Sequence, residues 1–303
     1  MDMSVDFAGI KMKNPVMVSS GTFGYGKEFS ELFDLNILGG IITKGTSLKP
    51  KAGNAPPRIC ETPGGLLNAI GLQNPGVEYV VEHYLPWLRK FDAAVIVNAC
   101  GGTVEDCVDV CKILDSADID GVELNLSCPN VKAGGGALGG DYETVKEVTG
   151  RVRRVLSKPL IVKLTPNVSD IASLAKGAED AGADAVSLVN TFLSMCIDIN
   201  TRRPILGNNT GGLSGPAIRP IAVRMVYEAA QAVRIPVLGM GGIVNGNDAI
   251  EFILAGATAI SIGTGNFYDP VCSVNTVNDI ESYMEKHGVS RIKDLVGAVI
   301  LNN

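Results

Sequence analysis

The feature of this chain that most constrains its fold is a regular alternation of short apolar runs with longer amphipathic segments. Eight apolar runs recur, at residues 15–19, 40–43, 94–97, 122–124, 160–162, 185–189, 237–239 and 260–262. Segments with the length and pattern of helices separate most of them, at residues 104–117, 142–156, 171–181, 217–232 and 247–255. Strands that are apolar throughout are typical of a parallel sheet covered by helices, and eight repeats predict a closed (β/α)8 TIM barrel of the α/β class.

The helix stops, the length and the insertions of the chain agree with one barrel that carries loop insertions at its carboxyl rim. Gly182 and Gly256 follow helical segments and are predicted helix stops. A length of 303 residues suits such a barrel, and no linker or shift in composition marks a second domain, so residues 1–303 are predicted to form a single domain. The longest insertion, residues 46–74, is rich in proline and glycine and is predicted to form a small hairpin or an ordered loop over the rim.

The bulk properties exclude several classes of protein. A net charge of −6 argues against a nucleic-acid-binding surface, and no apolar run approaches the length of a membrane span. Acidic residues stand near the amino terminus, where a signal peptide carries basic ones. The seven cysteines lack paired spacing, which predicts a reduced, cytoplasmic protein, and Cys107 and Cys111 have no further residue at the spacing of a metal site.

Polar residues follow the predicted strands, at the points where the strands end. In a barrel these points meet at the carboxyl rim, where active sites are built. A rim without a site would carry mixed, mostly small residues, whereas this one gathers two lysines, three asparagines and a cysteine. The residues in question are Ser20-Gly21, Lys44-Gly45, Asn98, Asn125 to Cys128, Lys163, Asn190-Thr191, Gly241-Gly242 and Gly263-Thr264.

Cys128 is the candidate for proton transfer. It lies in the segment Asn125-Leu-Ser-Cys-Pro-Asn130, where the adjacent amides can both donate and accept hydrogen bonds to a flat polar ligand. The two histidines, His83 and His287, do not follow strands, so a thiol is the favoured base near neutral pH. The alternative is a small buried hydrophobic residue, the usual role of a free cysteine.

The remaining rim residues indicate a phosphorylated cofactor. Glycine-bearing turns after the last two strands, Gly241-Gly242 and Gly263-Thr264, are predicted to open helices and to bind phosphate, and Gly215 can contribute similarly. The two lysines at strand ends, Lys44 and Lys163, can act in two ways. A lysine can form a Schiff base, as in a lyase, or it can remain a cation that stabilises a reduced flavin or a substrate carboxylate. The asparagines favour the second reading. Without a Gly-x-Gly-x-x-Gly fingerprint after a strand, flavin mononucleotide (FMN) fits best.

Five motifs, in order over nearly the whole chain, resemble the dihydroorotate dehydrogenase family. They are Lys44-Gly-Thr, Asn68-Ala-Ile-Gly-Leu-Gln-Asn-Pro-Gly76, Asn125-Leu-Ser-Cys-Pro-Asn130, Thr210-Gly-Gly-Leu-Ser-Gly-Pro216 and Gly239-Met-Gly-Gly242. The segment from Glu61 to Pro75 resembles the NAD-linked class 1B in particular. Cysteine at position 128 differs from the serine of class 2, and the fumarate-linked class 1A differs around Asn68.

The resemblance implies an activity and a set of site residues. Cys128 would remove the C5 proton of dihydroorotate while hydride leaves C6 for FMN, which forms orotate for pyrimidine biosynthesis. The implied substrate contacts are Lys44, Asn68, Ala69, Ile70, Gly71, Leu72, Asn125, Asn190 and Thr191. The implied FMN contacts are Ser20, Lys44, Gly45, Asn98, Asn125, Lys163, Val189, Gly215, Gly241, Gly242, Gly263 and Thr264.

The resemblance also implies partners. In class 1B a separate subunit carries FAD and a [2Fe–2S] cluster and passes electrons to NAD, and two catalytic and two electron-transfer subunits form a heterotetramer in which the catalytic subunits meet as a homodimer. This chain has no cysteine cluster of its own for such ligation. The alternatives are a class 1A-like enzyme, a flavoenzyme acting on another pyrimidine such as the dihydropyrimidine dehydrogenase barrel, the lyase that uses Lys163, and a non-enzymatic binding barrel.

Two further expectations concern the loop after Cys128 and the other cysteines. Residues 132–140 contain five glycines among nine residues, which suits either a lid over the thiol or a loose surface loop. Core packing is expected for Cys60, Cys100, Cys107, Cys111, Cys196 and Cys272.

Overall fold

Eight parallel strands close into a barrel, as the alternating pattern predicts. The computed structural model describes residues 1–127 and 138–302. Around the barrel the strands neighbour one another in the order β10-β15-β16-β3-β4-β7-β8-β9. Their bounds are β3 Val16–Val18, β4 Gly40–Ile42, β7 Ala94–Ala99, β8 Gly121–Asn125, β9 Leu160–Lys163, β10 Ala185–Leu188, β15 Val237–Met240 and β16 Ala259–Ile262. Each lies within one to two residues of its predicted range at either end, and the TIM-barrel prediction is confirmed.

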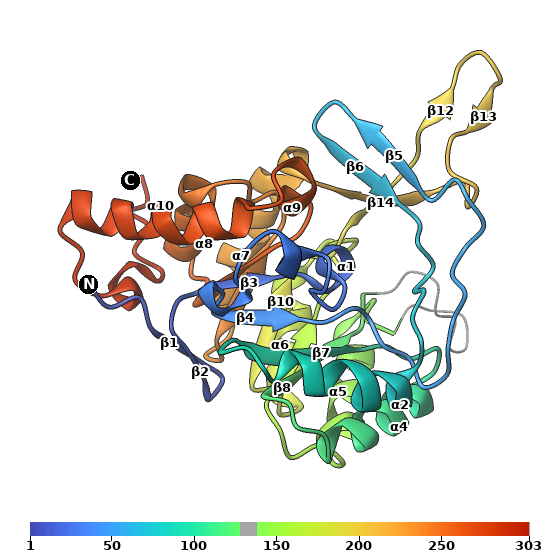
Figure 1. The fold of residues 1–303 in the computed structure, drawn as a ribbon, viewed down its shortest axis with the longest axis horizontal. Coiled ribbons are helices and arrows are strands. Elements are labelled where there is room, and N and C mark those ends of the chain that lie inside the picture. Colours follow the sequence, from blue (N-terminus) through green and yellow to red (C-terminus); the bar gives the residue numbers. More distant parts are fainter. Residues whose placement is uncertain (128–137, 303) are drawn as a thin grey trace.

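Burial on both faces explains why these strands are apolar throughout. The interior of the barrel covers one face and helices cover the other (Figure 1), so almost every strand residue is inaccessible to solvent. Polar strand residues such as Asn98, Glu123 and Ser187 are also fully buried. Because a buried polar group must be hydrogen-bonded, these residues require partners inside the barrel.

The helices around the barrel begin at side-chain caps. Thr103, Asp141, Asp170 and Asn245 each accept a hydrogen bond from the backbone N–H three residues further on. Each such cap stabilises a helix by about 1 kcal/mol. The outer helices are α4 Val104–Asp115, α5 Tyr142–Arg153, α6 Ile171–Asp180, α7 Arg219–Ala232, α8 Gly246–Leu254 and α10 Cys272–His287. Gly182 and Gly256 follow α6 and α8 with positive φ, as expected of helix stops.

A four-stranded antiparallel sheet stands at the carboxyl rim, and two insertions far apart in the sequence build it. The first insertion forms the predicted hairpin, and the second supplies the strands on its other side. The order is β11-β14-β6-β5, with β5 Ile59–Thr62, β6 Gly65–Asn68, β11 Phe192–Ser194 and β14 Gly211–Ser214. A hairpin of β12 Ile197–Asp198 and β13 Arg203–Pro204 projects beyond this sheet (Figure 1).

The remaining elements are short. A hairpin of β1 Val5–Phe7 and β2 Ile10–Met12 precedes the barrel. Short helices fill several loops, namely α1 Ser20–Phe23, α2 Val77–Tyr79, α3 Leu85–Leu88 and α9 Gly265–Tyr268, together with a π-helix at Val80–Tyr84 and 3-10 turns at Phe29–Glu31, Leu35–Ile37, Pro216–Ile218 and Ile292–Leu295.

The cysteines do not all pack in the core. Cys100, Cys107, Cys111 and Cys272 are buried, as expected. For the remaining two described cysteines the expectation is wrong, because Cys60 and Cys196 are only half-buried. Both belong to the insertions rather than to the barrel, which explains their exposure. Partial burial, and after it the neighbouring Cys196 thiol, raises the pKa of the Cys60 thiol.

Candidate active site at the carboxyl rim

Two adjoining cavities open at the carboxyl rim of the barrel, beneath the four-stranded sheet. One has a volume of about 360 Å³ and the other about 190 Å³, and both are lined by Asn68, Lys163 and Asn190 among others. Residues from barrel strands and residues from both insertions share their walls. The site is therefore assembled only where these distant segments meet.

The structure brings the described candidate residues together around these cavities. The larger cavity is lined by Ser20, Lys44, Gly45, Asn68, Ala69, Ile70, Gly71, Leu72, Asn98, Asn125, Lys163, Asn190 and Thr191. The smaller is lined by Val189, Gly215, Gly241, Gly242, Gly263 and Thr264. Cys128 lies outside the described residues, as do residues 132–137 of the glycine-rich loop.

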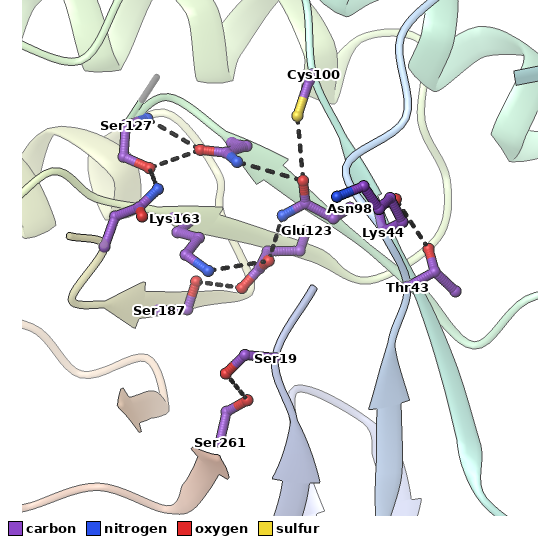
Figure 2. Close-up of polar contacts among 12 residues, drawn as sticks. Ser19, Thr43, Lys44, Asn98, Cys100, Glu123, Ser127, Lys163, Ser187 and Ser261 are labelled. Carbon is purple, nitrogen blue, oxygen red and sulfur yellow. Dashed lines mark hydrogen bonds and ion pairs between the residues drawn. The ribbon is translucent and has the colours of Figure 1, made fainter. Parts of the chain in front are cut away.

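The larger cavity has an amide-rich floor that is linked by hydrogen bonds (Figure 2). The Ser127 hydroxyl donates to Asn125 Oδ1 at 2.6 Å, and Asn125 Nδ2 donates to Asn98 Oδ1 at 3.3 Å. Asn190 Nδ2 donates in turn to the Ser127 hydroxyl, and the Cys100 thiol donates to Asn98 Oδ1. Each amide is thus held in one orientation, which fixes the donors and acceptors that a flat polar ligand would meet.

A fully buried carboxylate, Glu123, lies beneath this floor, and sequence reasoning missed it. Its Oε1 accepts a 2.7 Å hydrogen bond from the Ser187 hydroxyl, and its Oε2 accepts one from Asn98 Nδ2. The Lys163 ammonium lies 3.8 Å from Oε2 (Figure 2). A signal was present in the sequence, because a carboxylate inside an otherwise apolar strand needs a buried partner.

Lys44 is a second cation, half-buried at the wall of the larger cavity. Burial lowers the pKa of the Lys44 amine, the nearby Arg58 guanidinium acts in the same direction, and Cys100 opposes the shift. Such a lysine gains from an anionic ligand, because a carboxylate would compensate the charge that burial disfavours.

The smaller cavity fits the flavin mononucleotide expected from the sequence. Apolar side chains of Leu66, Val189 and Met240 line it beside Lys163, as a flat ring requires. Gly241 and Gly242 have φ of +128° and +85°. A Cβ at Gly241 would lie 2.8 Å from the Ala222 side chain, and one at Gly242 would lie 2.8 Å from a backbone oxygen. Only glycine lets the backbone line the cavity this closely.

One detail of the glycine turns differs from the prediction. Gly263-Thr264 directly precedes the short helix α9, but Gly241-Gly242 does not open a helix, because α8 begins only at Gly246. Asn245 caps that helix instead, through its side chain. Any phosphate at Gly241-Gly242 would therefore meet turn N–H groups and not a helix terminus.

Several cavity residues come from the second insertion and its neighbourhood and were not predicted as contacts. Asn167 is the most constrained, since its Nδ2 donates to Thr191 O at 3.1 Å and its Oδ1 accepts from the Leu193 N–H at 2.9 Å. The others in the larger cavity are Leu193, Asn208, Thr210, Gly211 and Gly212. The motif that begins at Thr210 was the available signal for the last three.

Residues 1–127 and 138–302 contain neither a metal-binding cluster nor a membrane-spanning helix. No cluster of three or more His, Cys, Asp or Glu side chains is arranged to hold a metal ion. None of the helices in these ranges combines the length and the apolar character needed to cross a membrane.

Comparison with known proteins identifies close relatives. A family model described as dihydroorotate dehydrogenase matches residues 2–284. Three curated relatives each carry the name dihydroorotate dehydrogenase B (NAD(+)), catalytic subunit. That of Geotalea daltonii is 54% identical over 98% of this chain and 98% of its own length. Those of Thermoanaerobacter pseudethanolicus and Alkaliphilus metalliredigens are 53% and 52% identical, each over 99% of both chains.

Proposed function

Because this chain belongs to the dihydroorotate dehydrogenase family, we propose that it is the catalytic subunit of an NAD-linked enzyme that oxidises dihydroorotate to orotate in pyrimidine biosynthesis. The observation that carries the proposal is identity above half, over nearly the full length, to relatives named as that subunit. We further propose that residues 1–303 act as one FMN-binding domain in the cytoplasm.

The larger cavity is the proposed substrate site. Dihydroorotate is a small ring with amide-like edges and one carboxylate. The amides of Asn68, Asn125 and Asn190 would hydrogen-bond the ring, with Ala69, Ile70, Gly71, Leu72 and Thr191 around it. Lys44 would bind the carboxylate, since it is a half-buried cation at the cavity wall.

The smaller cavity is the proposed FMN site. Gly215, Gly241, Gly242, Gly263 and Thr264 would hold the phosphate end, with Val189 against the ring. Lys163, which lines both cavities, is a further proposed FMN contact. The remaining proposed contacts line the larger cavity, namely Ser20, Lys44, Gly45, Asn98 and Asn125. FMN, when bound, supplies the acceptor for the hydride that leaves C6. Lys163 would balance negative charge there, and apolar walls would exclude water.

Cys128 is the proposed base for the C5 proton. The family motif around Cys128 supports this role. Its neighbours in sequence support it as well, because Asn125 lines the substrate cavity and the Ser127 hydroxyl donates a hydrogen bond to Asn125. A thiol must ionise to accept the proton, so its environment decides the pH range of activity.

Reoxidation of the flavin is proposed to need a partner. The relatives' name, catalytic subunit, implies a second kind of subunit. We propose that this partner carries FAD and a [2Fe–2S] cluster and that two of each subunit form a heterotetramer, with the catalytic subunits in contact as a homodimer.

The visible spectrum of the purified protein tests this function. We expect a yellow protein whose flavin absorbance bleaches on anaerobic addition of dihydroorotate but not of dihydrouracil. NAD reduction should be slow with this chain alone and fast once the electron-transfer subunit is added. A colourless protein, bleaching by dihydrouracil, or rapid fumarate-dependent turnover without a partner would each contradict the proposal.

Affinity for orotate is expected to fall as pH rises above neutrality. The carboxylate binds the protonated Lys44 ammonium, so binding is strongest below the lowered pKa of Lys44 and weakens as pH rises through it. Orotate titrations followed by flavin absorbance from pH 7 to 10 would measure this. Lys44→Met should weaken binding roughly 10- to 100-fold at pH 7 and remove this pH dependence. If the affinity for orotate depended on pH equally in the parent and in Lys44→Met, Lys44 would be excluded as the origin of the pH dependence.

A further inference from the structure

Glu123 occupies a position that packing alone does not explain. It lies in the middle of β8, between Val122 and Leu124, and is completely inaccessible to solvent. A buried carboxylate costs several kcal/mol unless it is paired and hydrogen-bonded, and an apolar residue at such a position is often neutral or stabilising. It does not line either rim cavity, so it is not placed to contact a ligand directly.

Most of the side chains that Glu123 contacts belong to the site above it. Asn98 and Lys163, two of its three partners, line the substrate cavity, and Lys163 also lines the smaller cavity. Ser187 completes the set from β10. Asn125 lies on the same face of β8 as Glu123, because alternate strand residues share a face. The Glu123 carboxylate thus lies deeper in the barrel than the hydrogen-bonded amides of the cavity floor.

We propose that Glu123 is the positioning residue of this site, which fixes the direction of the amide floor and serves as the countercharge of Lys163. This inference rests on the proposed function, because it assigns a role to Glu123 in ligand and flavin binding. It adds a residue that touches neither ligand and acts through its neighbours.

The first part follows from the donors and acceptors available. An ionised carboxylate can only accept hydrogen bonds, so Asn98 must turn its Nδ2 toward Glu123. Its Oδ1 then faces upward and accepts from Asn125 Nδ2 at 3.3 Å. Asn125 Oδ1 is in turn left to accept from the Ser127 hydroxyl at 2.6 Å. One charge therefore sets the orientation of the amides along the floor of the substrate cavity.

The second part follows from charge. Lys163 is 5% exposed and lies 3.8 Å from Glu123, so the pair carries no net charge in a region of low dielectric. Lys163 alone would present a full positive charge to the flavin and would favour its reduced form strongly. With Glu123 in place the cation is held at a defined position and its effect on the flavin is moderated.

The reduction potential of bound FMN, measured by anaerobic dye titration at pH 6, tests the proposal without turnover. Glu123→Gln keeps the shape of the side chain and removes the charge. We expect reduced FMN to gain at least tenfold in affinity relative to oxidised FMN, which raises the potential by about 30 mV for two electrons. We also expect the affinity for orotate to fall, because glutamine can donate as well as accept and no longer fixes the direction of Asn98.

Two matched variants separate the charge from packing. Ser187→Ala removes a hydrogen bond from the same carboxylate and keeps the charge, so the potential should stay at the parent value. Glu123→Asp keeps the charge and shortens the side chain, so it should bind FMN at a potential near that of the parent even if the glutamine variant holds FMN poorly.

Each outcome is decisive. The role of Glu123 would be overturned by any of three results in a protein whose parent form still bleaches with dihydroorotate. These are an unchanged reduction potential of FMN in Glu123→Gln, a shift of the potential in Ser187→Ala as large as that in Glu123→Gln, and loss of FMN from Glu123→Asp. A parent chain that binds no FMN would instead overturn the proposed function, and this inference with it.

Discussion

Replacement of Cys128 by alanine is expected to lower the rate of flavin reduction by dihydroorotate roughly 10²- to 10⁴-fold, while FMN stays bound. This is the usual contribution of a positioned acid or base. Stopped-flow absorbance under anaerobic conditions measures the step directly. In the parent the rate should rise with pH as the thiol ionises, around the ordinary thiol pKa of about 8.5. An unchanged rate in the variant would remove the thiol from the mechanism.

A control for this substitution is available within the core. Cys107 is fully buried in α4, and burial raises the pKa of its thiol to about 12, so it is inert as a base near neutral pH. Cys107→Ala should therefore keep the parental rate and pH profile. A rate loss in this variant equal to that of Cys128→Ala would indicate general damage to the protein and not loss of a base.

Replacement of Lys163 by methionine is expected to destabilise the folded protein by about 3 kcal/mol. The substitution leaves the Glu123 carboxylate buried without a countercharge, and breaking a buried ion pair from one side typically costs 3–5 kcal/mol. Because the hydrogen bonds from Asn98 and Ser187 to the carboxylate remain, the expected loss of folding stability lies at the lower end of that range. Urea unfolding of the FMN-free protein measures the change without a contribution from ligand binding.

The double variant Lys163→Met/Glu123→Gln should recover most of this loss, because no buried charge remains. Lys146→Met is the matched surface control: Lys146 is exposed on α5, where a single substitution changes stability by no more than about 0.5 kcal/mol. If the double variant were as unstable as Lys163→Met, the loss would come from packing around Lys163 and not from the unpaired carboxylate.

The barrel could be predicted from sequence because its strands are buried on both faces. Runs such as Leu160–Lys163 and Ala259–Ile262 are nearly continuous in apolar residues, and capped amphipathic helices separate them. The rim residues followed from the barrel, since strand ends of a parallel barrel converge. Glu123 did not follow, because it stands within a strand that was read as core.

The four-stranded sheet over the site could not be predicted, for a different physical reason. Its strands are only three or four residues long and half-exposed, so they carry little hydrophobic periodicity. Their pairing is non-local, since β6 lies beside β14, and four barrel strands, β7 to β10, lie between these two in the sequence. Nothing local in either insertion specifies the other as its partner.

This pairing has a consequence for how the protein matures on the ribosome. Asn68 Nδ2 meets its acceptor, Gly212 O, across 144 positions of the chain. Strand β6, Gly65–Asn68, is synthesised early. Its N–H and C=O groups on the side of β14 have no partner strand until β14 emerges from the exit tunnel. A nascent chain that stalls before that point has an incomplete barrel and lacks the four-stranded sheet over the rim cavities. The ability to retain a cofactor is therefore among the last properties that the growing polypeptide acquires.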